Sequence, residues 1–172
     1  MNVRVGKGSS DAWYIYRLKF GSLLPAIYVL VFYGETEVIL NQRGVIISFR
    51  RLSQASSIVR RFASGETCRC PFGSNHVSLT CDLTELAQFI MYRRKDRHAK
   101  LLNGLNTLLE LVDATKLEFP KQYKKSLYAL ADHVTFSDDV ATFFSSSVFS
   151  RKQVLDAVLW SIGVVCTRTL IV

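Results

Sequence analysis

The sequence predicts an α+β fold in which a β-sheet precedes a helical half. In the first 81 positions, apolar residues alternate with polar ones or form short β-branched and aromatic runs, as strands do. After position 82, apolar residues recur every three to four positions, as in amphipathic helices. Because strands come first and helices afterwards, we expect an N-terminal antiparallel β-meander of about four to five strands with a C-terminal helical half packed on it.

Alternation and turn residues locate the strands. Residues 13–20 alternate between apolar and basic side chains, which is typical of a strand with one buried face. Residues 26–33 form an uninterrupted β-branched and aromatic run, which favours a central strand buried on both faces. Gly34 and Glu35 predict a hairpin turn, and Gly44 predicts a second turn in which the glycine takes a positive φ. The remaining predicted strands are 37–40, 45–49 and 76–80.

Capping residues locate the helices. A first helix should begin at Ser53 and end at Gly65, followed by a loop over 65–75. Two apolar stripes between residues 83 and 113 predict either one long helix or two helices interrupted within 93–100. Three further helices are predicted, over 121–133 after Pro120, over 138–148 after Ser137, and from the Ser150 and Gln153 capping box onward.

The last predicted helix is apolar nearly all round, which favours a position at the centre of the core. Leu159 is among the residues we expect to be buried there. The apolar stretch 154–172 also carries Asp156 and Arg168, so it predicts a buried helix with a short tail and not a membrane span.

A chain of 172 residues can bury its own core, so we expect one domain over residues 1–172. The alternative is a subdivision into a basic, β-rich half, residues 1–81, and a helical half, residues 82–172. Residues 1–11 lack the apolar segment of a secretory signal. We therefore expect a cytoplasmic protein without membrane contact, whose four cysteines are reduced.

Most of the charge imbalance lies in the first hundred residues. They hold 15 Lys and Arg against 7 Asp and Glu, whereas residues 101–172 hold 7 of each. Arg50 and Arg51 come just before a predicted helix, and positive charges near the N-terminus of a helix are destabilising. Their presence there therefore indicates that they bind an anion from outside the chain. The alternative is an ordinary solvated surface. The candidate binding residues are Arg50, Arg51, Arg60, Arg61, Arg93, Arg94, Lys95, Arg97 and Lys100.

Metal and catalytic chemistry find little support in the sequence. Cys68, Cys70, His76 and Cys81 could supply four zinc ligands, but they lack the spacing of paired Cys-x-x-Cys knuckles, so we predict no metal and no cofactor. His98 and His133 could act as acids or bases only beside a second group that the sequence does not reveal. Since no phosphate-binding glycine loop or nucleophile elbow is present, we predict no catalytic residues, and the sequence favours a protein that is not an enzyme.

These observations favour a small, non-catalytic protein that binds a macromolecule. The leading expectation is a protein-binding module of the inhibitor, immunity-protein or antitoxin kind, with a basic face against an acidic protein partner. The alternative is an RNA- or DNA-binding protein that uses the same face on phosphates. It ranks second because no nucleic-acid-binding motif accompanies the charge. A small nuclease-like enzyme ranks third.

Overall fold

The computed structural model describes residues 11–35, 37–92, 98–137 and 140–172. The strands are β1 (Ala12–Lys19), β2 (Ile27–Tyr33), β3 (Glu37–Ile39), β4 (Asn41–Gln42), β5 (Val45–Phe49), β6 (Phe72–Asp82) and β7 (Thr169–Ile171). The α-helices are α1 (Ala55–Phe62), α2 (Leu83–Tyr92), α3 (His98–Ala114), α4 (Lys121–Phe136), α5 (Val140–Ser146) and α6 (Arg151–Thr167). Two short 3₁₀ helices are η1 (Leu52–Gln54) and η2 (Gly65–Arg69).

The sheet confirms the α+β class and is mixed. The pairs β1–β2, β2–β3 and β4–β5 are antiparallel between consecutive strands, as the predicted meander requires, whereas the antiparallel pair β2–β5 joins strands that are not consecutive. The outer strand β6 lies parallel to β1, and β7 lies parallel to β5. The short tail predicted after the last helix is present, but it forms a strand, which was not predicted. Its β-branched and leucine side chains add a strand at the uncovered side of β5, a placement that only the tertiary fold creates.

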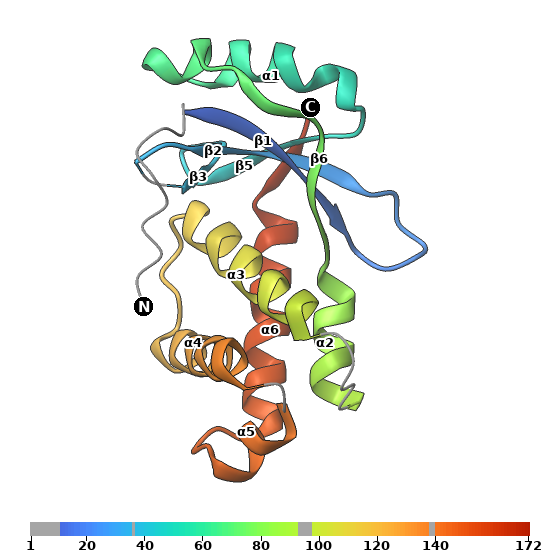
Figure 1. The fold of residues 1–172 in the computed structure, drawn as a ribbon, viewed down its shortest axis with the longest axis vertical. Coiled ribbons are helices and arrows are strands. Elements are labelled where there is room, and N and C mark those ends of the chain that lie inside the picture. Colours follow the sequence, from blue (N-terminus) through green and yellow to red (C-terminus); the bar gives the residue numbers. More distant parts are fainter. Residues whose placement is uncertain (1–10, 36, 93–97, 138–139) are drawn as a thin grey trace.

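The sheet separates two apolar layers. In Figure 1, α1 lies above the sheet, and α2, α3, α4 and α6 lie below it. Side chains of β1 alternate between these layers: Trp13 and Ile15 pack with α1, whereas Tyr16 and Leu18 pack with the helical half. The alternation predicted for residues 13–20 is confirmed, but the expectation of a single buried face was wrong, because Trp13 and Ile15 are buried on the α1 side as well. The lower core cluster contains buried residues from both the β-rich and the helical parts of the chain.

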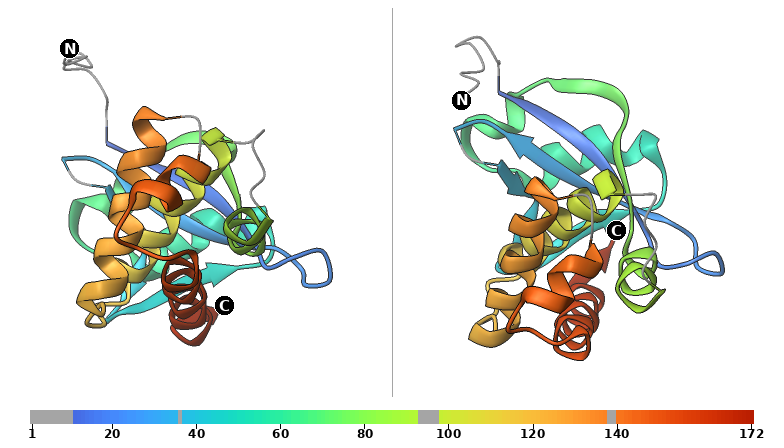
Figure 2. Two further views of the ribbon diagram at one scale, coloured as in Figure 1. Left: turned by 90° about the horizontal axis from the view of Figure 1, so that it is seen from below. Right: turned by 60° about the horizontal axis from the view of Figure 1, so that its bottom comes forward.

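The hairpin between β1 and β2 projects from the body. Figure 2 shows it extending sideways in both views. Its bend begins at Gly21, whose φ of 86° lies in the left-handed region that glycine enters without strain. Its tip carries Leu23, which is 95% exposed, and Leu24, which is 60% exposed.

The stretch 83–113 forms two helices. α2 ends at Tyr92 and α3 begins at His98, so the alternative of two helices is the one observed. The predicted helix from Ser53 is split into η1 and α1 and ends at Phe62, before Gly65. The loop predicted over 65–75 instead contains η2 and the start of β6. Of the helix predicted over 138–148, α5 covers Val140–Ser146, and residues 138–139 lie outside the described residues.

The helix α6 is only partly buried. Its predicted capping box is confirmed, because Gln153 N donates to Ser150 Oγ at 3.2 Å and Ser150 N donates to Gln153 Oε1 at 2.8 Å. Its buried residues are Val154, Ala157, Val158, Ser161 and Val165. The prediction that Leu159 is buried was wrong, because this side chain is 52% exposed. Neighbouring elements cover one face of α6, and Leu159, Gly163 and Cys166 are exposed on the rest of the helix. Within the described residues, no helix has the length and apolarity needed to cross a membrane.

Candidate functional site

An apolar groove opens between the sheet and the helical half, at the base of the projecting hairpin. It has a volume of about 430 Å³. We call it the Arg50 groove after its single charged lining residue. Its walls come from the hairpin and β2, from the residue after β5, and from α2, α6 and β7. The lining residues are Phe20, Leu24, Pro25, Ile27, Arg50, Thr84, Ile162, Cys166, Thr169 and Ile171.

The local chain geometry explains why the groove stays open. Gly21 and Pro25 turn the hairpin away from the sheet, which holds Leu24 at the rim instead of in the core. The last turn of α6 presents Cys166, which is exposed, and the chain then rises into β7. An apolar side chain beyond the lining extends the surface, since Leu23 of the same hairpin is also exposed. An exposed apolar hollow of this kind is typical of an interaction site.

Arg50 is the one predicted binding residue that lines this groove. It follows Phe49, the last residue of β5, and its side chain is exposed. Among the described residues, no carboxylate forms an ion pair with it. Its guanidinium can therefore accept an anionic group from outside the chain.

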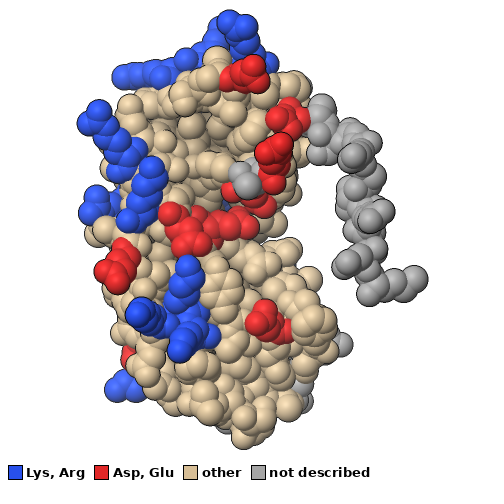
Figure 3. Space-filling view, turned by 90° about the vertical axis from the view of Figure 1, so that its left-hand side faces the viewer, with Lys and Arg blue, Asp and Glu red and all other residues tan. Residues whose placement is uncertain are grey.

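The other arginines predicted in this region belong to the α1 side of the sheet. Arg51 precedes η1, and its backbone N–H donates to Gln54 Oε1 at 2.9 Å. On α1, Arg60 Nε donates to the carbonyl oxygen of Ser56 at 3.3 Å, and the Arg61 guanidinium lies 5.0 Å from the centre of the Phe62 ring. All three side chains are exposed. Figure 3 shows basic residues along this upper end of the molecule.

Lys100 lies on the opposite side of the sheet from α1, near the start of α3. The structure thus does not bring Lys100 together with Arg60 and Arg61 in one patch. The other members of that cluster, Arg93, Arg94, Lys95 and Arg97, lie outside the described residues.

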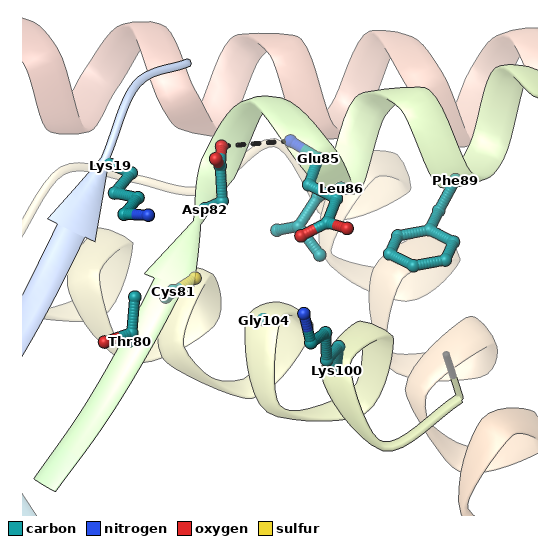
Figure 4. Close-up of a pocket in the computed structure, with 9 residues that line it drawn as sticks. All are labelled: Lys19, Thr80, Cys81, Asp82, Glu85, Leu86, Phe89, Lys100 and Gly104. Atoms are coloured by element: carbon teal, nitrogen blue, oxygen red, sulfur yellow. Dashed lines mark hydrogen bonds between the residues drawn. The ribbon is translucent and has the colours of Figure 1, made fainter. Parts of the chain in front are cut away.

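Lys100 instead borders a small polar pocket of about 190 Å³ between β6, α2 and α3. Figure 4 shows Lys100 pointing toward Glu85, and Lys19 beside the end of β6. Asp82 Oδ1 accepts hydrogen bonds from the backbone N–H groups of Thr84 and Glu85 at 3.1 and 3.2 Å, so it caps α2. With two acids and two lysines around it, this pocket has no net preference for an anion.

Cys81 lines the polar pocket but is not a reactive thiol. Burial, together with the smaller effect of the nearby Asp82 and Glu85 charges, raises its pKa to about 12. A thiol with so high a pKa carries almost no nucleophilic thiolate at neutral pH.

An acidic cluster joins the sheet to α3. Tyr16 on β1 hydrogen-bonds Tyr33 on β2, and the Tyr16 hydroxyl donates to Glu37 Oε1 on β3 at 3.1 Å. Glu110 on α3 faces Glu37, and desolvation by burial together with the Glu37 charge raises the pKa of Glu110 to about 7. Figure 3 shows the band of acidic side chains crossing this face. The cluster is a structural contact between the sheet and α3, because each of its side chains already interacts with another member of the cluster.

The remaining residues that we considered for chemistry are dispersed. The four cysteines are free thiols. His76 is exposed, and the His133 ring packs 5.4 Å from that of Phe143. In the part of the chain that the structure describes, no group of three or more His, Cys, Asp or Glu side chains is arranged to hold a metal ion.

Sequence reasoning missed most of the groove. Arg50 was identified, but Ile162 and Cys166 of the last helix were expected in the core and Ile171 in a tail, and nothing was predicted for Leu24. A signal was nevertheless present, because Leu23 and Leu24 stand between Gly21 and Pro25, two residues that favour a turn. Leucines placed in a turn are exposed, and exposed leucines beside one another mark an interaction surface.

Comparison with known proteins shows similarity of fold alone. No protein-family model matches the chain, and no curated protein matches it in sequence. Among solved structures, the chain is similar to the C-terminal domain of SatS, a crystal structure in complex with bromine. The two share 12% sequence identity with a TM-score of 0.54, and the match covers 94% of each chain. This similarity extends over both the sheet and the helical half.

Proposed function

We propose that the protein works by binding another protein, which docks in the Arg50 groove. The observation that carries this proposal is the composition of the groove: nine uncharged lining residues surround one exposed arginine. Protein interfaces commonly have an apolar centre, a polar rim and an arginine anchor. The partner should present apolar side chains for the hollow and an acidic group for Arg50.

The apolar lining favours protein over nucleic acid as the partner. Nucleic acids are held mainly by cations on phosphates, and their affinity follows the number of such contacts. The groove offers one cation and no exposed aromatic ring stack. The exposed leucines of the hairpin, Leu23 and Leu24, have no role in phosphate binding, whereas burial in a partner would stabilise a complex.

The α1 side supports a second candidate, an RNA- or DNA-binding surface. Residues 50–72 contain five arginines, one glutamate and no lysine. Arginine binds phosphate oxygens through paired N–H groups, which lysine cannot do. Arg51, Arg60 and Arg61 are exposed there, on the far side of the sheet from Lys100.

Two variants separate these candidates. Cys166→Trp fills the Arg50 groove from an exposed position, and Arg60→Glu with Arg61→Glu reverses the charge on α1. Tagged full-length protein and both variants are used to capture partners from the source cell, with and without nuclease. We expect protein partners that survive nuclease and are lost from Cys166→Trp only. Partners that Cys166→Trp retains would contradict docking in the groove. If partners are instead lost only from the α1 variant and their capture is abolished by nuclease, the second candidate function is identified.

A further inference from the structure

The strand β7 leaves hydrogen-bonding groups unused beside the Arg50 groove. Ile46 N donates to the carbonyl oxygen of Arg168 at 2.8 Å, and Val172 N donates to that of Ser48 at 2.9 Å. In a parallel pair only alternate residues of a strand bond to a given neighbour. Because 168 and 172 face β5, the backbone N–H and C=O groups of Thr169 and Ile171 point away from it. Among the described strands, β7 pairs with β5 alone.

The same two residues line the groove. The side chains of Thr169 and Ile171 form part of its wall, beside Ile162 and Cys166 of α6. A chain laid along β7 would therefore meet backbone donors and acceptors at its edge and an apolar hollow beneath it. Side chains of a strand alternate between the two faces of a sheet. Every second side chain of an added strand would point toward the groove.

The positive charge of Arg50 further limits which chain could occupy the groove. Arg50 stands just beyond the end of β5, and Ser48 of β5 is the register partner of Ile171. The guanidinium thus lies near the end of the β7 edge. A second copy of the chain would bring another Arg50 to the same groove, which is unfavourable, whereas a carboxylate would be attracted.

We propose that the occupant of the Arg50 groove is an extended peptide segment of the partner, which adds to β7 as a further strand, places an apolar side chain in the groove and pairs a carboxylate with Arg50. This inference rests on the proposed function and specifies its partner. Strand addition of this kind draws affinity from main-chain hydrogen bonds and specificity from pockets for alternate side chains.

In the test, a displayed library of random octapeptides is selected for binding to the protein. Peptides that also bind the Cys166→Trp variant are removed by counter-selection. Enriched sequences should have apolar residues at alternate positions and an Asp, a Glu or a terminal carboxylate near one end. Affinities of synthetic peptides are then measured by fluorescence polarisation. Arg50→Gln should weaken them by about tenfold, the loss of one charge-assisted contact. The matched control Arg43→Gln, at an exposed arginine in the turn between β4 and β5, should leave them unchanged.

Backbone methylation tests strand addition directly. Methylation of the peptide N–H groups that face β7 should weaken binding at least tenfold, and methylation at the alternate N–H groups should not. Equal binding by all methylated peptides would overturn strand addition while leaving protein binding in the groove intact. Enriched peptides without an acidic group, or binding unchanged in Arg50→Gln, would overturn the role of the carboxylate. If selection enriches nothing over Cys166→Trp, both this inference and the proposed function fail.

Discussion

The carboxyl group of Glu110 on α3 hydrogen-bonds the side chain of Glu37 on β3, so two acidic groups join the helical half to the sheet. Such a contact is favourable only when one of the two carboxyls keeps its proton. Burial, the Glu37 charge and this hydrogen bond raise the pKa of Glu110 from about 4.5 to about 7. The contact between the two layers is thereby linked to pH.

We expect the stability of the wild-type protein to fall as pH rises from about 5 to 8. The folded state holds the Glu110 proton up to a pKa of about 7, whereas the unfolded chain releases it near 4.5. The stabilisation that comes from the Glu110 proton is therefore fully present below the pKa of Glu110 in the unfolded chain. It is lost as pH rises through the pKa of Glu110 in the folded protein. Because Glu110 is only half-buried, water screens the effect, which we expect to be about 1 kcal/mol. Urea unfolding of wild type and Glu110→Gln at several pH values measures it.

In that experiment Glu110→Gln should lose this part of the pH dependence and should be more stable than wild type at pH 8. Asp113→Asn is the matched control, because Asp113 on the same helix is exposed and pairs with Lys124 at 3.7 Å. It should keep the wild-type slope. Parallel pH profiles for wild type and Glu110→Gln would show that the two carboxyls do not share a proton.

Gly44→Ala should destabilise the fold by at least about 2 kcal/mol. Gly44 has a φ of 79°, and a Cβ there would lie 2.3 Å from the carbonyl oxygen of Thr115, where the end of α3 meets the β4–β5 turn. Gly65→Ala provides the comparison, because Gly65 also has a positive φ of 63° but has nothing within 4 Å of its Cβ position. It should cost only the strain of a left-handed residue, about 1–2 kcal/mol. Thermal unfolding of both variants tests the difference, and equal losses would disprove the close approach to Thr115.

Leu159→Ala should change the free energy of unfolding by less than about 1 kcal/mol. The side chain is 52% exposed, so its removal leaves no enclosed cavity. Leu108→Ala on α3 is the matched variant, because Leu108 is fully buried and should cost about 2–5 kcal/mol. Chemical denaturation with both variants measures the two losses. A large loss for Leu159→Ala would mean that the outer face of α6 is covered in the folded protein.

Three of the four thiols should react in the native protein at pH 8, and Cys81 should not. Cys81 is buried with a pKa of about 12, whereas Cys68 and Cys70 are partly exposed and Cys166 is exposed. Titration with a chromogenic disulfide before and after unfolding counts the two sets, and all four should react once the chain is unfolded. Burial also raises the pKa of Cys166, so this thiol should be the slower of the accessible ones. Rapid reaction of Cys81 in folded protein would place it outside the core.

The alternating pattern of residues 13–20 determined which side chains of β1 share a face, because side chains of a strand point alternately to its two sides. Ser150 and Gln153 likewise determined the start of α6, since a capping box needs only residues three positions apart. Gly44 determined a turn for the same local reason. These features depend on neighbouring residues in the chain, and the sequence alone was sufficient for them.

The Arg50 groove was decided by the tertiary structure. Arg50 lies more than a hundred positions before Cys166 and Ile171 in the chain. Ile171 also belongs to a strand that exists only through its pairing with β5. Apolar periodicity reports which residues prefer to leave water, but not whether a neighbour arrives to cover them. Leu159 and Cys166 have the same pattern as Val158 and Val165, yet only the latter two meet the rest of the core. The candidate site includes apolar residues, such as Leu24 and Cys166, that the fold leaves uncovered.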